Sequence, residues 1–400
     1  MKILFLTLAK IDDIEQSGIY PDLLRKFRKE NHEVTIVCPH ERRFGLPTRL
    51  IEKNGVKILN VWSPNIQKTN TFEKGITTVI IEYLFLHGIK KRLKYIDFDL
   101  ILYSTPPITF TNLIIKLKKL SGAKTYLLLK DIFPQNAVDL SLINSKSIIY
   151  KYFRRKEKLL YKISDYIGCM SAANLEYILI NNNEISINKI EINPNSIEIK
   201  LDTNLINFKN SIFIKYNIPT NKIIFLFGGN LGIPQGINYL KKNIQNCVSI
   251  SEIYFLIIGD GTEFFEIYNW IKNENILNAK IIKEIPKIDY DQITQYSQVG
   301  LIFLNPKFTI PNFPSRVLSY MQNKLPIICA TDSTTDIGTI ASNNDFGFSC
   351  LTSDYDSFFN FAVKLLDNKL REKMGDNSYK YLIKEYNVEI SYKKIIDKFN

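Results

Sequence analysis

The chain has 400 residues, of which 45% are hydrophobic and 12% aromatic, and these values exclude a disordered chain and predict two domains of about 200 residues each. Its formal net charge is +12, and nearly all of it falls in residues 1–200, which hold 31 Lys and Arg against 20 Asp and Glu, whereas residues 201–400 hold 21 against 20. This asymmetry predicts an anionic partner for the first half; anionic lipid, a lipid diphosphate and nucleic acid all satisfy it, and because no DNA- or RNA-binding motif accompanies the charge, we favour a membrane surface and no nucleic acid.

The first half opens as a β-loop-α-β unit. Strand character over residues 2–8 is followed by a loop, by Gly18 and by an amphipathic helix over 20–29, and a turn then leads into a second strand over 34–38. Further strands are expected at 56–61, 100–103, 125–129 and 189–192. This alternation predicts a doubly wound parallel sheet.

Two polar residues, Lys130 and Asp131, directly follow the strand expected at 125–129. In open α/β sheets, ligands bind just beyond the carboxyl ends of the strands, so both residues are candidates for function. The alternative for Asp131 is a solvated cap with no functional role.

Two helices of the first half carry many cations. The helix expected at 71–95 has an apolar body and a basic end, and the helix expected at 147–163 carries six Lys and Arg against one acid, Glu157. An apolar body with a basic end fits a helix that lies in a membrane interface. A core helix whose C-terminal cations complement the helix dipole is the alternative.

Cysteine and histidine usage excludes several classes of site. The five cysteines are scattered without a CxxC motif, which predicts buried, reduced thiols, and with three histidines they make neither a metal site nor a catalytic triad. We expect no signal peptide, because residues 1–7 run straight into a strand, and no transmembrane helix, because no run of about 18 uncharged apolar residues occurs.

The second half repeats the alternation after a polar stretch that ends near Pro219 and predicts an interdomain linker. Strands are expected at 222–227, 253–258, 280–282, 299–304 and 325–330. Residues 331–341 and 345–350 are interpreted as a loop and an edge strand, and helices are expected at 354–367 and 370–385. Two strand-to-helix turns are rich in glycine, which lets a backbone approach an anion closely, but neither turn is a dinucleotide fingerprint or a P-loop.

The stretch 311–328 holds the strongest single signal. Pro314, Ser315 and Arg316 stand where a helix begins, and Val317 and Leu318 start its buried face. Ser315 has N-cap character, a helix N-terminus attracts phosphate, and Arg316 adds a fixed cation. These residues predict a sugar-nucleotide site.

We therefore predict an α/β fold of two Rossmann-like domains that face each other across a cleft. The expected boundaries are 1–198 for the first domain and 199–380 for the second, with a C-terminal helix over 381–400 that packs back on the first domain.

The ordered motifs resemble those of bacterial family-4 glycosyltransferases of the GT-B fold, and more narrowly the WbuB-like branch, which builds O-antigen or capsule repeats. The resemblance covers nearly the whole chain and rests on Gly18, Ser104 to Pro107, Lys130 to Pro134, Asp165, Asn193 to Asn195, Gly229 to Gly236, Gly259 to Gly261, Pro314 to Met321 and Gly375.

The resemblance implies a retaining hexosyltransferase that needs neither a metal nor a cofactor. The donor would be an NDP-sugar, in particular a UDP-HexNAc or a deoxy-HexNAc, and the acceptor a glycan on a polyprenyl diphosphate. It also implies a cytoplasmic protein that binds peripherally to the inner face of the cytoplasmic membrane in surface polysaccharide synthesis.

Roles for individual residues follow from the same resemblance. Asp131 and Arg316 would be catalytic, and the first domain would bind the acceptor through Gly18 and Lys130. The second domain would bind the donor through Gly229, Asn230, Leu231, Gly232, Gln235, Gly236, Gly259, Gly261, Glu284, Ile285, Pro314, Ser315, Val317, Leu318 and Ser319.

The chain departs from the family pattern in two places. Asn230 and Gln235 stand where many members have Arg and Lys, which leaves Arg316 as the candidate cation for the diphosphate. Ser319 stands where a glutamate commonly contacts the ribose, and an earlier glutamate is replaced near Pro311. Two alternatives therefore stay open: a catalytically silent GT-B binding or assembly protein, and a UDP-sugar epimerase.

Overall fold

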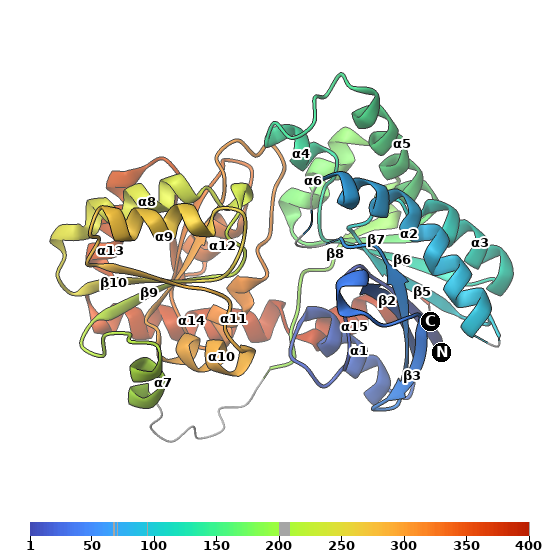
Figure 1. Cartoon of the computed structure of the whole chain (residues 1–400), viewed down its shortest axis with the longest axis horizontal. Coiled ribbons are helices and arrows are strands. Elements are labelled where there is room, and N and C mark those ends of the chain that lie inside the picture. The colour runs from blue at the N-terminus through green and yellow to red at the C-terminus, as the bar shows by residue number, and fades with distance from the viewer. Residues whose placement is uncertain (67–68, 70, 94, 200–208, 400) are drawn as a thin grey trace. The chain divides into compact units, whose positions relative to one another are not determined.

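The computed structural model describes the whole chain except residues 67–68, 70, 94, 200–208 and 400. It divides into two compact units (Figure 1): Met1–Glu198 together with Asn387–Asn400 form the first unit, and Ile199–Tyr386 form the second. Residues 200–208 of the linker predicted before Pro219 lie outside the described residues, whereas Lys209–Lys215 form a helix that was not predicted.

An eight-stranded sheet in the order β3-β4-β2-β1-β5-β6-β7-β8 forms the first unit. Neighbouring strands are parallel except β3 and β4, which are antiparallel. The strands are β1 (Lys2–Leu6), β2 (Glu33–Glu41), β3 (Arg49–Lys53), β4 (Val56–Ser63), β5 (Leu100–Ser104), β6 (Lys124–Leu129), β7 (Tyr166–Cys169) and β8 (Ile190–Ile192). Central strands such as β5 are buried along their whole length, as expected where helices cover both faces of a parallel sheet.

The helices of the first unit are α1 (Ile19–Lys29), α2 (Thr71–Arg92), α3 (Thr111–Ser121), α4 (Gln135–Asp139), α5 (Ile148–Ile163), α6 (Ala172–Asn181) and α15 (Val388–Ile396), with short 3-10 turns at Arg42–Phe44 and Ile187–Lys189. The strand order reverses at β1, so right-handed crossovers place α1 and α3 on opposite faces of the sheet. Helix α15 packs against α1, whereas α2, α3 and α5 pack side by side in that order (Figure 1).

A six-stranded, fully parallel sheet in the order β11-β10-β9-β12-β13-β14 forms the second unit. Its strands are β9 (Ile223–Gly228), β10 (Ile253–Ile258), β11 (Ala279–Ile282), β12 (Val299–Phe303), β13 (Ile327–Thr331) and β14 (Gly347–Leu351). Its helices are α7 (Lys209–Lys215), α8 (Ile237–Asn246), α9 (Phe264–Asn273), α10 (Lys287–Tyr296), α11 (Arg316–Gln322), α12 (Ile337–Asn343), α13 (Tyr355–Lys364) and α14 (Asn368–Glu385), with 3-10 turns at Ile233–Gln235 and Cys247–Ser249.

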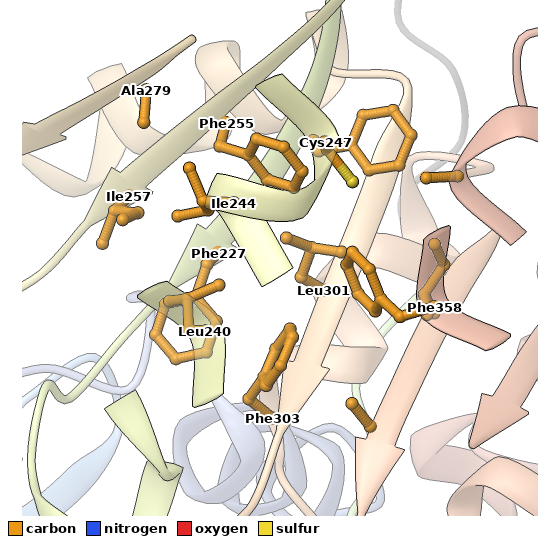
Figure 2. Packing of buried hydrophobic residues seen from close by; sticks show 14 of the residues in the cluster. Phe227, Leu240, Ile244, Cys247, Phe255, Ile257, Ala279, Leu301, Phe303 and Phe358 are labelled. Atoms are coloured by element: carbon orange, nitrogen blue, oxygen red, sulfur yellow. The ribbon is translucent and has the colours of Figure 1, made fainter. Parts of the chain in front are cut away.

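Aromatic side chains fill the core of the second unit (Figure 2). Phe227, Phe255 and Phe303 are buried on one face of its sheet, where Leu240 of α8 and Phe358 of α13 cover them. Large, fully buried side chains of this kind supply the main stabilisation of such a unit. This packing holds the ends of β9 and β12 in fixed positions.

The structure differs from the sequence-based prediction in several elements, among them α12 and β3. Residues 331–341 were expected to be a loop, but Ile337–Asn343 form helix α12. Gly338 weakens the sequence signal for this helix, because glycine is a poor helix former. The glycine is needed for close packing on β14, since a Cβ at this position would lie 2.2 Å from Ser349 Oγ. The antiparallel edge strand β3 was also missed.

The chain returns to the first unit later than the sequence predicts. The returning helix was expected at 381–400, but α14 continues to Glu385 and α15 begins at Val388. The ring of Tyr386 lies 5.5 Å from that of Phe313, which holds it in the second unit, and the Asn387 side chain caps α15 by accepting the Glu389 N–H.

Both connections between the units pass through one place in the first unit. Ile197 and Asn387 form a parallel β-bridge, and the Val388 N–H donates to Ile197 O at 2.9 Å. In the part of the chain that the structure describes, no helix is long and apolar enough to cross a membrane.

Candidate functional site

The strand order of the second unit reverses between β9 and β12, because the chain proceeds from β9 to β10 and β11 on one side and from β12 to β13 and β14 on the other. Such a reversal leaves a crevice beyond the carboxyl ends of the two central strands, where ligands of open α/β sheets bind. Every donor-binding residue predicted from the sequence lies in the loops that follow β9, β10, β11 and β12 or in helix α11.

The two glycine-rich turns are paired through their backbones. The Gly229 N–H donates to Ile258 O at 2.9 Å, and the Leu231 N–H donates to Asp260 O at 3.0 Å. A Cβ on Gly259 would lie 1.8 Å from Gly229 O. A Cβ on Gly261 would lie 2.2 Å from Leu231 O. These glycines are therefore needed so that one backbone can approach another, and the N–H groups of Gly229 and Leu231 are already occupied.

We expect Gly259→Ala to disrupt the pairing of the two glycine-rich turns, because the added Cβ would meet the carbonyl oxygen of Gly229 and the backbone would have to shift. The free energy of unfolding should fall by about 1–3 kcal/mol, the usual range for overpacking. Gly75→Ala on α2 is the matched control, since a Cβ at Gly75 meets nothing within 4 Å and alanine favours a helix. Denaturant unfolding of both variants checks the prediction, and equal stability of the two would contradict it.

An amide pair closes the loop after β9. Gln235 Oε1 accepts from the Gly232 N–H and from Asn230 Nδ2, both at 3.3 Å. The same loop is tied to the loop after β12, because the Asn305 N–H donates to Pro234 O at 2.9 Å. A Cβ on Gly236, whose φ is +59°, would lie 3.1 Å from Leu304 O. Asn230 and Gln235 thus shape a neutral loop, and they supply no charge to a ligand.

Arg316 brings the positive charge to this crevice. Its guanidinium carbon lies 4.6 Å above the ring of Phe227 and 3.5 Å from the position that a Cβ on Gly229 would take. Its Nη1 is buried and has no hydrogen-bond partner in the part of the chain that the structure describes. Burial lowers the pKa of Arg316, so the site holds a cation that is poorly solvated and available to an anion.

The start of helix α11 differs from the expectation in detail. Ser315 is the N-cap by position, but its φ of −62° and ψ of −18° are helical and its side chain makes no capping hydrogen bond. The N–H groups of Val317 and Leu318 donate to Pro314 O at 3.2 Å and to Ser315 O at 3.1 Å. The N-cap expected at Ser315 is therefore wrong in geometry.

The remaining predicted donor residues fall into two groups. Leu231, Val317 and Leu318 have buried side chains, so only their backbones can reach a ligand. Ser319, Pro314 and Ile285 are half-buried, and Glu284 is exposed on the loop after β11. This loop lies beside the β10 turn, because the Gly259 N–H donates to Ile282 O at 3.0 Å.

Two tyrosines that were not predicted as site residues support the end of β9. Tyr320 Oη accepts the Gly228 N–H at 3.0 Å and donates to Leu226 O at 3.1 Å. Tyr290 fills the space beside Gly228, where a Cβ would lie 2.0 Å from its Oη. Burial raises the pKa of both phenols, so they remain neutral donors. Tyr320 follows Arg316 by four residues, which places both side chains on the same face of a helix, and this spacing was the sequence signal for Tyr320.

The first unit has its own reversal of strand order, between β1 and β5. Gly18 precedes α1 on the loop after β1, and its N–H donates to Asp22 Oδ1 at 3.1 Å. Lys130 and Asp131 follow β6, and their N–H groups donate to the Thr105 hydroxyl on the loop after β5, at 2.9 and 3.2 Å. The structure therefore brings all three predicted residues of this unit to the carboxyl edge of one sheet.

Lys130 and Asp131 differ in their surroundings. Asp131 Oδ1 accepts from Asn136 Nδ2 at 2.8 Å, which orients its carboxylate. Lys130 Nζ lies 3.5 Å from Asn193 O, and burial lowers its pKa to about 7. An amine of this kind is divided between its neutral and charged forms near neutral pH, and an anionic ligand would charge it.

His40 is a polar residue at the same edge that was not predicted from the sequence. It lies near the carboxyl end of β2, is buried, and neither ring nitrogen has a hydrogen-bond partner among the described residues. Burial lowers its pKa, and nearby Lys10 lowers it further. Its position at the end of an apolar strand was the only sequence signal. In the described part of the chain, no three His, Cys, Asp or Glu side chains group as a metal site requires.

Comparison with known proteins gives three kinds of match. Residues 208–381 match the family model of glycosyl transferases group 1. The probable glycosyltransferase WbjE of Pseudomonas aeruginosa is 23% identical over 293 residues, which make up 73% of this chain and 71% of WbjE.

Solved structures show the same two-unit architecture. Sucrose-phosphate synthase from Thermosynechococcus elongatus aligns with a TM-score of 0.74 at 13% identity, over 100% of this chain and 98% of that one. HepE from Anabaena in complex with UDP-glucose aligns with a TM-score of 0.69 at 13% identity, over 100% and 99%. At these identities the likeness establishes the fold, and the predicted α/β fold of two Rossmann-like domains, the GT-B fold, is confirmed.

Proposed function

We propose that this chain, a glycosyltransferase with a group 1 domain over residues 208–381 and the GT-B fold, transfers a sugar from a nucleotide sugar to a lipid-linked glycan. The donor is a UDP-sugar, either a UDP-HexNAc or a deoxy form of it, and the acceptor is carried on a polyprenyl diphosphate. Transfer retains the anomeric configuration and uses no metal, as in the WbuB-like branch of surface polysaccharide synthesis.

The observation that carries the donor half of this proposal is the environment of Arg316. A planar cation stacked on Phe227, with a buried and unpartnered Nη1, lies at the end of β9 where the strand order reverses. A diphosphate leaving group gains negative charge as the glycosidic bond breaks, and a guanidinium can meet two of its oxygens at once. HepE, which has the same fold, binds UDP-glucose.

The acceptor half rests on an apolar surface near the carboxyl edge of the first unit. Helix α2 exposes Ile76, Val79 and Tyr83, and α5 exposes Ile148, Ile149 and Tyr152; we name these six side chains the apolar face. The two helices are linked where Lys156 Nζ lies 3.7 Å from Glu82 Oε1. Exposed cations, among them Lys151 and Arg155, lie beside the apolar side chains of α5. Apolar side chains flanked by cations suit an anionic membrane surface.

The apolar face lies close to the predicted acceptor residues. Helix α5 begins soon after α4, and α4 follows the end of β6 where Lys130 and Asp131 stand. A membrane against the start of α5 therefore brings a lipid-linked diphosphate toward these two residues. Lys130 would pair with the diphosphate, and Asp131 would orient the accepting hydroxyl group.

The purified full chain, incubated with a panel of UDP-sugars and a short-chain polyprenyl-diphosphate sugar, tests the proposed reaction. We expect a glycosylated lipid by mass spectrometry with release of UDP, and a retained anomeric configuration by NMR. Binding of UDP without turnover across the panel would point to a silent binding protein, and conversion of a donor without acceptor would point to an epimerase; either result rejects the proposal.

Membrane contact has a separate test. We expect the double variant Ile148→Asn and Ile149→Asn to lose about tenfold or more in binding to vesicles with anionic lipid, because two side chains that are 85% and 58% exposed would no longer enter the interface. Ile180→Asn on α6, at 67% exposure, is the matched control outside the apolar face. Vesicle sedimentation measures both, and equal losses would contradict the assignment.

A further inference from the structure

An open pocket of about 640 Å³ lies at the amino-terminal edge of the first unit's sheet. The predicted acceptor residues lie at the opposite, carboxyl edge. The starts of β6 and β7, the ends of α3 and α5 and the segment before β8 form its walls. Its most prominent lining side chains are six lysines: Lys118, Lys119, Lys124, Lys162, Lys189 and Lys398. A neighbouring hollow of about 400 Å³ shares two of them.

Carboxylates neutralise only part of this charge. Lys118 Nζ lies 2.8 Å from Asp165 Oδ2, and Lys398 Nζ lies 3.1 Å from Glu191 Oε2. The same oxygen of Asp165 also accepts the Thr125 N–H at 2.8 Å, so Lys118 shares it with the backbone. Among the described residues, no carboxylate forms an ion pair with the other four: Lys119, Lys124, Lys162 and Lys189.

Helix dipoles account for only part of the cluster. Lys118 and Lys119 lie in the last turn of α3 and Lys162 lies in the last turn of α5, where cations are favoured. Lysines near helix ends commonly meet exposed carbonyl groups, and two of the six do so: Lys118 Nζ donates to Ile163 O at 3.1 Å, and Lys189 Nζ donates to Lys162 O at 2.7 Å. Lys124 begins a strand, where no helix dipole acts. Burial lowers the pKa of Lys189; the nearby Asp165 carboxylate offsets part of this effect, and Lys118 adds a smaller lowering.

This pocket is remote from the transferase edge of the same sheet. Helix α5 runs from Ile148 beside the apolar face to Ile163 in the pocket, and its 16 residues span about 24 Å. Strand β6 likewise runs from Lys124 in the pocket to Leu129, and Lys130 follows at the opposite edge. A ligand bound at one edge does not reach the other.

We propose that this lysine pocket is a second ligand site, which binds an anion bearing two phosphate groups. Its volume lies within the usual range of small-molecule sites, and four lysines without carboxylate partners match the charge of a diphosphate. The ligand is either a free diphosphate or a lipid headgroup that carries two phosphate groups, as in cardiolipin; both sources present the same chemistry. The inference does not depend on the proposed sugar transfer.

Titration of the full chain with inorganic pyrophosphate by calorimetry, and sedimentation with phosphatidylcholine vesicles that contain cardiolipin, distinguish the two sources. The double variant Lys119→Glu and Lys124→Glu changes two exposed side chains of the pocket. Lys272→Glu with Lys380→Glu changes the net charge by the same amount on exposed helix positions of the second unit. We expect the pocket variant to weaken binding about tenfold or more and the control to change it little.

Arg316→Ala separates this site from the donor site. Pyrophosphate binding that survives Arg316→Ala and is lost in the pocket variant supports a site for free diphosphate. Binding only to the anionic vesicles, with the same loss in the pocket variant, supports a headgroup site. The proposal is overturned if the pocket and control variants weaken binding equally, if Arg316→Ala abolishes it, or if neither probe binds.

Discussion

Replacing Arg316 by alanine is expected to lower turnover by about 10²-fold or more, the range for losing a preorganised electrostatic contact to a transition state. The same change should leave the free energy of unfolding unchanged or raise it. Arg316 Nη1 is buried without a partner among the described residues, and burial lowers the pKa of the side chain, so the empty site holds an unfavourable charge. Steady-state kinetics and denaturant unfolding measure the two effects.

Arg371 provides the contrast, because its guanidinium donates to Leu365 O and Leu366 O at 2.6 and 2.9 Å in a structural role. Arg371→Ala should destabilise the second unit and leave the turnover of the folded enzyme intact. Arg316→Lys keeps the charge but loses the planar stack on Phe227, and we expect an intermediate turnover. Full activity of Arg316→Ala would remove this residue from the mechanism.

Stability of the chain is expected to rise with pH between about 7 and 10 because of Lys130. Burial lowers the pKa of Lys130 to about 7 in the folded chain, whereas an unfolded lysine keeps a pKa near 10.4. Between these values the unfolded state binds one proton more, so the free energy of unfolding increases with pH and is lowest below about pH 7. A shift of this size corresponds to a few kcal/mol.

Lys130→Met should remove this pH dependence and raise stability at pH 7, while it lowers the affinity for the lipid diphosphate acceptor. Lys57→Met, at an exposed position on β4, is the matched control and should leave the profile unchanged. Denaturant unfolding at a series of pH values checks the predicted stability, and the Michaelis constant for the acceptor checks the predicted loss of affinity. A profile of Lys130→Met that matches the wild type would show that Lys130 is charged in the folded protein at neutral pH.

Much of the fold followed from local patterns in the sequence. Buried apolar runs such as 253–258, bounded by glycine or polar residues, predict strands of a parallel sheet, and β10 has these bounds. Ligands of open α/β sheets bind beyond the carboxyl ends of the strands, and this rule correctly predicts that Lys130 and Gly229 lie in loops at those ends. Such local signals are strong because burial on both faces of a sheet demands continuous apolar segments.

Features that depend on distant contacts were not predictable. The space beside Gly228 is filled by Tyr290, and the turn at Gly259 is shaped by Gly229, so the reason for each glycine lies in another part of the chain. The N-cap expected at Ser315 failed because Pro314 and Ser315 carbonyls already accept the first N–H groups of α11. The roles predicted for the donor and acceptor residues stay predictions.

The parallel bridge between Ile197 and Asn387 makes the second unit an insertion within the first. The chain leaves and re-enters the first unit at adjacent points, so a linker of about six residues from Glu198 to Asn387 would bypass the whole second unit. Helix α15 must be retained in such a deletion, because Val388 and Ile395 belong to the core beneath α1. Helix α15 therefore completes the domain that β1 begins, and a nascent chain cannot finish folding its first unit until α15 has been synthesised.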